Sequence, residues 1–183
     1  MGEVTTLIRA ANGGDPDALN RLFTLLYDDL HRLAHARLRS NAPDVLLDTT
    51  SLLHETYARL VSAEEVTLQD RHHFFAYAAR AMRFIVVDFA RRHQALRRGA
   101  GQLHVPLSDA AAAAVPERSD EVIRVHEALD QLEQVDPALC RLVEMLYFVG
   151  LPVGAVAETL GVSTRTVERH WLKARAILFA SIS

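Results

Sequence analysis

The chain has 183 residues, half of them apolar, and a formal net charge of −3 at pH 7. This length allows one ordinary domain or two small ones, with enough apolar residues for a core. No apolar run is long enough to span a bilayer and no N-terminal signal peptide is recognisable, so we expect a cytoplasmic protein without membrane insertion. The single cysteine, Cys140, excludes an internal disulfide and fits a reducing compartment.

Helical periodicity dominates the first half of the chain. Apolar residues recur at helical spacing over Thr5–Asn12, Asp15–Leu38, Thr50–Ser62 and His72–His93. Patterns typical of strands are nearly absent, so the sequence predicts an all-α fold. His31 and His35 are four residues apart, a spacing that helical metal ligands use. No carboxylate–histidine cluster completes this pair, so we expect no metal site and no cofactor.

The fourth of these helices is strongly basic. Seven arginines and one acid lie between Arg71 and Arg98, a local net charge of +6. A stripe facing the core is predicted at Phe75, Ala79, Met82, Val86 and Phe89. The other side carries Tyr77, Arg80, Phe84 and Arg91, with Arg83 beside them. Such a concentration of arginine suits a nucleic-acid backbone, and the aromatic rings either stack on unpaired bases or pack on a neighbouring helix.

Glycine, proline and a run of five alanines interrupt the amphipathic pattern between Gly99 and Ser119. We interpret residues 99–119 as a linker, with room for a weak helical turn in the alanines. The linker separates a domain at residues 1–98 from a domain at residues 120–183. In the second domain, helices are predicted at Glu121–Gln134, Pro137–Phe148, Val153–Leu160 and Thr164–Ile182.

The segment Gly150–Leu178 has the layout of a helix-turn-helix motif. Pro152 can start its first helix, Gly161 supplies the turn and Ser163 is a plausible N-cap of the second helix. Core stripes are predicted at Val153, Val156, Ala157 and Leu160, and at Val167, Trp171, Ala174 and Leu178. The remaining surface of the second helix carries Arg165, Thr166, Arg169, His170, Lys173 and Arg175. Its basic excess predicts DNA binding, with a merely solvated amphipathic helix as the alternative.

Three stretches together resemble a family of bacterial transcription factors. They are SLLHETYARL (Ser51–Leu60), FFAYAARAMRFIVVDFARR (Phe74–Arg92) and the C-terminal helix-turn-helix. In this order they resemble an extracytoplasmic-function (group IV) sigma-70-type factor, closest to the subset with tryptophan in the region 4 recognition helix. The resemblance implies that residues 1–98 correspond to region 2 and residues 120–183 to region 4. It also implies a non-enzymatic subunit that binds core RNA polymerase and directs promoter-specific transcription initiation.

The resemblance assigns a partner to each surface. Docking on the β′ clamp helices of polymerase would use Asp48, Leu52, Leu53, Glu55, Thr56 and Arg59, and the β flap is a further expected contact. Contact with the −10 element would use Tyr77, Arg80, Arg83, Phe84, Asp88, Arg91 and Arg92, and the loop Ser62–Arg71 would hold an extruded base. At the −35 element, base edges would be contacted by Arg165, Thr166, Arg169 and His170, and phosphates by Lys173 and Arg175.

The start of the docking helix departs from the family pattern. That helix usually begins with several acidic residues, whereas Asp48-Thr49-Thr50-Ser51 contains one. A phosphorylated hydroxyl adds about −1.5 to −2 charges. We therefore hypothesise that a Ser/Thr kinase acts on Thr49, Thr50 or Ser51 and switches on polymerase binding. Capping of the helix by Thr50 or Ser51 is the simpler explanation of these hydroxyls. Control by an anti-sigma factor is the other possibility that the sequence leaves open.

Two other classes of protein are alternatives to a sigma factor. A two-domain helix-turn-helix regulator that is not a polymerase subunit is the nearest alternative. It predicts a sensory pocket or an α/β receiver in the first domain, and neither pattern is present. It also leaves the basic helix Arg71–Arg98 unexplained. An enzyme is not expected, because the sequence contains no Gly-rich phosphate loop, no nucleophile elbow and no cluster of catalytic residue types.

Overall fold

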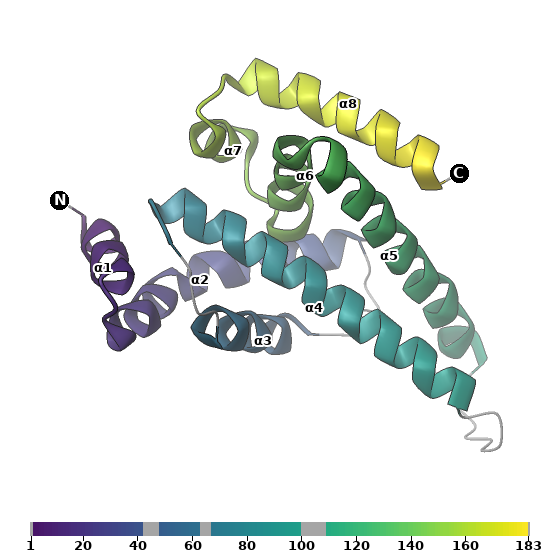
Figure 1. The fold of residues 1–183 in the computed structure, drawn as a ribbon. Helices are drawn as coiled ribbons and strands as arrows, with labels where there is room; N and C mark the ends of the chain where they lie inside the picture. Colours follow the sequence, from purple (N-terminus) through teal and green to yellow (C-terminus); the bar gives the residue numbers. More distant parts are fainter. Residues whose placement is uncertain (1, 42–47, 63–66, 100–108, 183) are drawn as a thin grey trace.

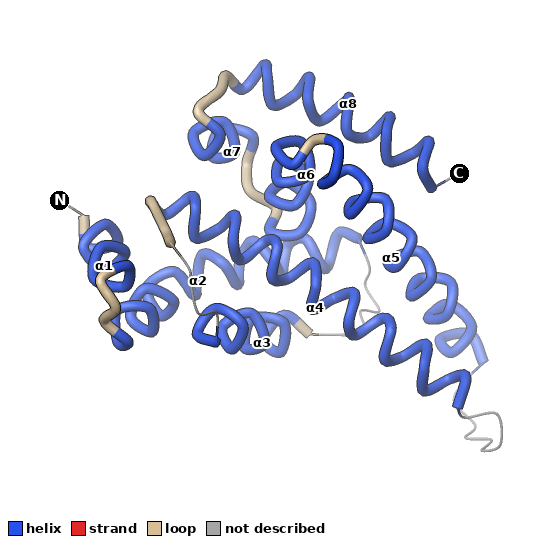
Figure 2. Tube along the Cα trace, in the orientation of Figure 1, coloured by secondary structure: helices blue, strands red, loops and turns tan. Residues whose placement is uncertain are grey.

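The computed structural model describes residues 2–41, 48–62, 67–99 and 109–182. Over these ranges the chain forms helices and connecting loops and contains no strand (Figure 2), which confirms the all-α class. In chain order the elements are α1 (Glu3–Asn12), α2 (Pro16–Asn41), α3 (Thr49–Ser62), α4 (Arg71–Gly99), α5 (Asp109–Val135), α6 (Pro137–Glu144), the π-helical turn η1 (Met145–Val149), α7 (Val153–Leu160) and α8 (Thr164–Ile182). Of the described helices, none is long and apolar enough to cross a bilayer.

The long helix α4 runs through the middle of the molecule (Figure 1). It packs against α3 and also against α5, α6, η1 and α7, so it is covered on more than one side. The predicted core stripe is only partly as expected, because Phe75, Ala79 and Met82 are buried while Val86 and Phe89 are half-buried. Further side chains are buried outside that stripe: Phe74, Ala78, Ala81, Arg83, Ile85, Val87 and Ala90.

One apolar core joins the two halves of the chain. It contains Leu22, Leu26, Leu30, Leu53, Phe74 and Met82 of the first half together with Leu142, Met145, Val149, Val156 and Val167 of the second. A smaller cluster lies between α5, α6 and α8, at Leu129, Leu132, Leu139, Cys140, Val143 and Ala174. Trp171 packs against both clusters. In this structure the C-terminal helices are therefore packed on the N-terminal ones through a shared interior.

The described part of the expected linker is helical. α4 continues to Gly99 and α5 begins at Asp109, while residues 100–108 lie outside the described part of the chain. Gly99 and residues 109–119 of the expected linker are thus helical, and the alanines lie in a longer helix than the weak turn expected there. Alanine has the highest helix propensity, so a run of five favours helix over coil. α5 then lies along α4 (Figure 1), and this packing adds the tertiary support that a helix needs in water.

Local capping signals set the ends of the C-terminal helices. Asp136 caps α6 by accepting a hydrogen bond from the Leu139 N–H at 3.0 Å, with Pro137 at the first helical position. Gly150 and Gly161 follow η1 and α7 with φ of 77° and 64°, a left-handed conformation in which glycine avoids the steric cost of a Cβ atom. The turn predicted at Gly161 is thus confirmed.

Candidate nucleic-acid interface

α8 is set in place by its cap and by its buried stripe. The Ser163 Oγ accepts a hydrogen bond from the Thr166 N–H at 3.2 Å, which is the predicted N-cap. Val167 and Ala174 are fully buried, and Trp171 and Leu178 are half-buried against the core clusters. The core stripe predicted for this helix is therefore confirmed, and the rest of its surface is directed away from the core.

The surface of α8 away from the core is basic. Arg165, Arg169 and Arg175 are exposed, while His170 is half-buried. Two other members of the predicted set already have intramolecular partners. The Thr166 hydroxyl lies 2.9 Å from the Ser163 hydroxyl, and the Lys173 ammonium lies 3.1 Å from the Asp136 carboxylate. The three arginines are therefore better placed to meet an anionic ligand than Thr166 or Lys173.

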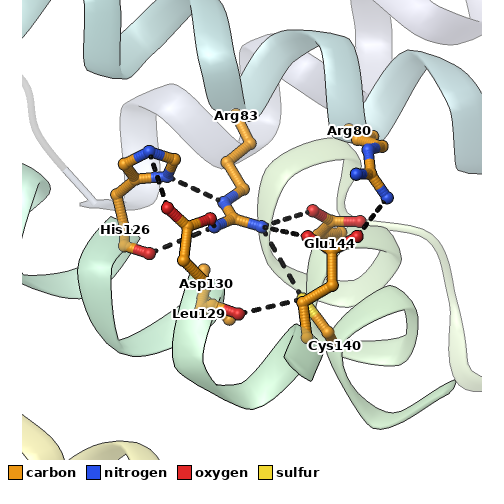
Figure 3. Close-up of polar contacts among 8 residues, drawn as sticks. Arg80, Arg83, His126, Leu129, Asp130, Cys140 and Glu144 are labelled. Carbon is orange, nitrogen blue, oxygen red and sulfur yellow. Dashed lines mark hydrogen bonds and ion pairs between the residues drawn. The ribbon is translucent and has the colours of Figure 1, made fainter. Parts of the chain in front are cut away.

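Arg83 lies in the interior, against expectation. Its side chain is 0% exposed, and residues of α5 and α6 surround the guanidinium (Figure 3). Its Nη1 donates to Glu144 at 2.8 Å, and its Nη2 donates to Asp130 at 2.5 Å and to the His126 carbonyl at 3.1 Å. Its Nε donates to the His126 Nδ1 at 3.1 Å. We call Arg83, His126, Asp130 and Glu144 the Arg83 cluster. In this arrangement Arg83 cannot contact DNA, because the second half of the chain covers it.

The contacts of the Arg83 cluster determine its protonation. Burial, and then the charge of Arg83, lower the pKa of His126, so its ring is neutral near pH 7. Because its Nδ1 accepts from Arg83, we place its proton on Nε2, which lies 3.4 Å from Asp130. Burial raises the pKa of Glu144, and the hydrogen bond from Arg83 opposes that shift.

Other predicted −10 residues of α4 are also engaged within the protein. Arg80 pairs with Glu133 of α5 at 2.5 Å, and Asp88 pairs with Arg59 of α3. The Phe84 ring lies edge-to-face on the His126 ring with centroids 5.5 Å apart, so in this structure it packs on a neighbouring helix. Tyr77 is half-buried, and burial raises the pKa of its hydroxyl. Arg91 and Arg92 are exposed, and so is Arg80 despite its pairing with Glu133.

Three of the six predicted polymerase-docking residues belong to the core. Leu52, Leu53 and Thr56 are 2%, 0% and 1% exposed, and the Thr56 hydroxyl donates to the Leu52 carbonyl at 2.7 Å. These three side chains therefore face the core in this structure, and their helical spacing with Leu60 was the signal of a buried stripe. Arg59 is partly covered through its pairing with Asp88. The exposed surface of α3 instead carries Thr50, His54, Glu55, Ala58, Val61 and Ser62, with Asp48 at its start.

The N-terminus of α3 is capped by Asp48. Its Oδ1 accepts from the N–H groups of Thr50 at 2.9 Å and Ser51 at 3.1 Å, and its Oδ2 accepts from the Ser51 hydroxyl at 2.5 Å. These hydrogen bonds, led by the Ser51 hydroxyl, lower the pKa of Asp48. Thr49 is 8% exposed, with its hydroxyl 3.3 Å from the His35 Nδ1. The prediction that Thr50 or Ser51 caps α3 was therefore wrong. Of the two threonines, Thr49 is buried and Thr50 is exposed.

A long-range clamp holds the segment that leads into α4. The Asn12 side chain donates to the Leu68 carbonyl at 2.6 Å and accepts from the Leu68 N–H at 3.0 Å. Asp70 then caps α4 by accepting from the His73 N–H at 2.8 Å. The loop Ser62–Arg71 was predicted to hold an extruded base, and its residues 63–66 lie outside the described part of the chain. Sequence patterns missed Asn12, because its contact joins positions 56 residues apart and leaves no local signature.

The remaining candidates for metal or redox chemistry are accounted for by packing. The His31 and His35 rings stack with centroids 5.8 Å apart. In the described ranges no group of three or more histidine, cysteine, aspartate or glutamate side chains could hold a metal ion. Cys140 is buried, and burial raises the pKa of its thiol to about 12. Cys140 is thus a structural thiol, because a buried thiol with a raised pKa is unreactive.

An all-α chain with a basic, exposed recognition surface falls in the class of helical DNA-binding transcription proteins. The family model for ECF sigma factors matches residues 1–183, so the chain belongs to the ECF sigma factor family. It is accordingly a transcription regulator that binds core RNA polymerase and acts at promoter DNA in promoter-specific initiation. Neither the curated proteins nor the solved structures yielded a match. The narrower resemblance to members with tryptophan in region 4 stays a prediction. Membership in the ECF sigma factor family favours a polymerase subunit over a helix-turn-helix regulator that acts without being one.

Proposed function

We propose that α8 reads the −35 element of the promoter from the major groove. Arg165 and Arg169 contact base edges, flanked by Thr166 and His170, while Lys173 and Arg175 hold phosphates. The support is the exposure of the arginines on a helix whose other side, at Val167 and Ala174, is buried. A bidentate arginine–guanine contact contributes about 1–3 kcal/mol of discrimination against a wrong base. Phosphate contacts add affinity without sequence information.

The −10 element is the partner of α4 in this proposal. Arg91 and Arg92 are exposed already and make the first contacts. Arg80, Arg83 and Phe84, whose partners lie on α5 and α6, join them after these helices have left α4. Tyr77 and Asp88 complete the set. The loop Ser62–Arg71 receives an extruded base, whose unstacking costs a few kcal/mol that the loop must offset. Residues 1–98 and residues 120–183 thereby act as separate units on the promoter, although they share a core in the free chain.

Polymerase docking is assigned to the exposed surface of α3. Glu55, His54, Ala58 and Val61 lie on it, with Asp48 at the N-terminal end. Negative charge at this end is favoured by the helix dipole and attracts a basic partner. Leu52, Leu53 and Thr56 support this surface from the core, and Arg59 flanks it. The second half of the chain contacts the β flap, so both units are tethered and their spacing on the promoter is set by polymerase.

Phosphorylation of Thr50 is the switch that we propose for this docking surface. Thr50 is exposed in the first turn of α3, where a phosphate would add the negative charge that the family pattern supplies with acids. Thr50→Glu should raise the affinity for core polymerase about two- to fivefold, as expected for one exposed charge contact. Thr24→Glu places the same charge on an exposed site of α2 and should leave the affinity for core polymerase unchanged. Equal affinities of the two variants would refute the switch and favour an anti-sigma factor.

Run-off transcription with purified core polymerase on a genomic promoter library tests the function as a whole. The match of the ECF model over the entire chain carries the proposal. New transcripts that share a two-part upstream motif are expected when the protein is added. Replacing Arg165 and Arg169 by alanine should alter only the upstream part of that motif. No transcripts, even from the Thr50→Glu variant, would contradict the proposal and favour a regulator that binds an operator.

A further inference from the structure

We propose that Asp136 competes with DNA phosphate for the Lys173 ammonium and thereby limits how strongly the protein binds any DNA sequence. The inference rests on the proposed function, which assigns Lys173 to a phosphate contact. It adds to this surface an acid that weakens phosphate binding beside the arginines that read bases. Asp136 accordingly tunes the affinity for DNA without changing which bases are selected.

Asp136 occupies the corner between two helices that support α8. It follows α5, which ends at Val135, and it precedes α6, which begins at Pro137. Both helices pack against α8 (Figure 1). From this corner the Asp136 Oδ2 lies 3.1 Å from the Lys173 Nζ. A carboxylate from another part of the chain is therefore inserted beside a cation of the DNA-reading helix.

The Asp136 carboxylate is held in place by the backbone around it. Its Oδ1 accepts a hydrogen bond from the Leu139 N–H at 3.0 Å, so only Oδ2 faces Lys173. The Asp136 N–H donates to the Leu132 carbonyl at 2.7 Å, and the Asp136 carbonyl accepts from the Cys140 N–H at 3.0 Å. The hydrogen bonds from Leu139, and then from Lys173, lower the pKa of Asp136, so its carboxylate is charged near pH 7. The negative charge thus stays beside Lys173 when a phosphate approaches.

The ion pair attracts DNA less than an unpaired lysine would, because its net charge is zero. Each phosphate that a protein cation neutralises adds about 0.9 to the slope of log K against log salt for duplex DNA. The Lys173 side chain is 57% exposed, so a phosphate can reach the ammonium and charge, rather than access, limits the contact. Phosphate contacts carry no base information, so Asp136 lowers the affinity for every sequence alike.

Removal of the Asp136 charge tests the competition. Asp136→Asn keeps the cap of α6, because asparagine caps a helix about as well as aspartate. The complex of each variant with core polymerase is titrated with labelled promoter DNA and with labelled mixed-sequence duplex at several salt concentrations. We expect Asp136→Asn to bind both DNAs about two- to fivefold tighter at fixed salt, as for one exposed charge contact. The salt slope should become steeper by about one.

Two further variants show whether the effect passes through Lys173. Glu127→Gln removes the same formal charge from an exposed site of α5 and should leave affinity and salt slope as in the parent. In a Lys173→Gln background, most of the gain from Asp136→Asn should disappear. A gain of equal size there would overturn the competition, because Asp136 would then repel DNA directly. Weaker DNA binding by Asp136→Asn alone would also overturn it, because Asp136 would then orient Lys173 toward phosphate.

The remaining outcomes separate the inference from the function on which it rests. Equal affinities and equal salt slopes for the parent and Asp136→Asn would overturn the inference and leave the proposed function intact. If faster hydrogen exchange of the Leu139 amide shows that the cap is lost, Asp136→Ser takes the place of the asparagine variant, because serine also caps helices. A parent complex that binds promoter and mixed-sequence DNA equally would instead contradict the proposed function.

Discussion

Arg83 is a permanently charged side chain in the interior of the protein. Such a burial is tolerated only when carboxylates and hydrogen-bond acceptors replace the lost water. Glu144 and Asp130 supply the charge, and two acceptors of His126 take up further N–H groups. The cluster therefore links three helices through one residue, and its loss is expected to be felt across the molecule.

Replacement of Arg83 by methionine leaves Glu144 buried without its cation. An uncompensated buried charge costs about 3–5 kcal/mol. We expect the free energy of unfolding, measured with urea, to fall by about that amount. Arg91→Met, at an exposed position of the same helix, should change it by less than about 0.5 kcal/mol. Similar unfolding midpoints for the two variants would show that Arg83 is not buried in solution.

The Asn12 clamp gives a second prediction for a single residue. Asn12→Ala leaves the N–H and carbonyl of the buried Leu68 without their partner, at a cost of about 1–3 kcal/mol. Hydrogen exchange of the Leu68 amide should become faster. Asn12→Asp keeps the oxygen that accepts this N–H and should preserve much of the protection. Unchanged exchange in the alanine variant would mean that the clamp does not form.

At the scale of elements, α8 depends on its first turn. Ser163→Ala removes the hydroxyl that accepts the Thr166 N–H, and loss of such a cap costs about 0.5–2 kcal/mol. We expect a lower melting temperature and faster exchange of the amides at the start of α8. Ser181→Ala, near the other end of the same helix, provides the control because its hydroxyl bonds the Ile177 carbonyl and caps no N–H group. Equal effects of the two changes would argue against the cap.

Apart from helix ends that shift by up to six residues, as at the C-terminus of α4, helix positions followed from local signals, with two exceptions. α7 and α8 have the predicted bounds, because capping residues and short-range periodicity are written in consecutive residues. The segment predicted as one helix, Pro137–Phe148, divides into α6 and η1 after Glu144. α5 starts earlier than predicted, at Asp109. Both exceptions involve segments that pack on α4, so tertiary contacts act there in addition to local preference.

For the whole molecule, His126 should make stability depend on pH. Its pKa in the folded protein lies below the ordinary 6.5, so the unfolded chain takes up a proton first as the pH falls. The contribution of the neutral His126 ring to the free energy of unfolding is complete above pH 6.5. It is lost as the pH falls through the pKa of His126 in the folded protein. The charged groups that act on it are Arg83, Asp130, Arg91 and Asp88. The raised pKa of Glu144 has the opposite effect. The contribution of Glu144 to the free energy of unfolding is complete below pH 4.5 and is lost as the pH rises through its pKa in the folded protein.

The pH effect is measured by comparing the parent with His126→Gln, whose amide oxygen can accept from Arg83 without titrating. Between about pH 7.5 and about pH 5, the melting temperature of the parent should fall further than that of the variant. The contribution of Glu144 is common to both proteins and cancels in the difference. Parallel pH profiles would show that protonation of His126 does not oppose folding.

The sequence by itself determined the helical class, most helix positions, the buried stripe of α8 and the concentration of arginine on α4. These properties depend on propensity, periodicity and charge within short segments. Only the tertiary structure decided that Arg83 lies beneath α5 and α6. The physical reason is that exposure depends on which helix covers which face, and such contacts join residues far apart in the chain. A basic face therefore looks the same in the sequence whether water, DNA or another helix lies against it.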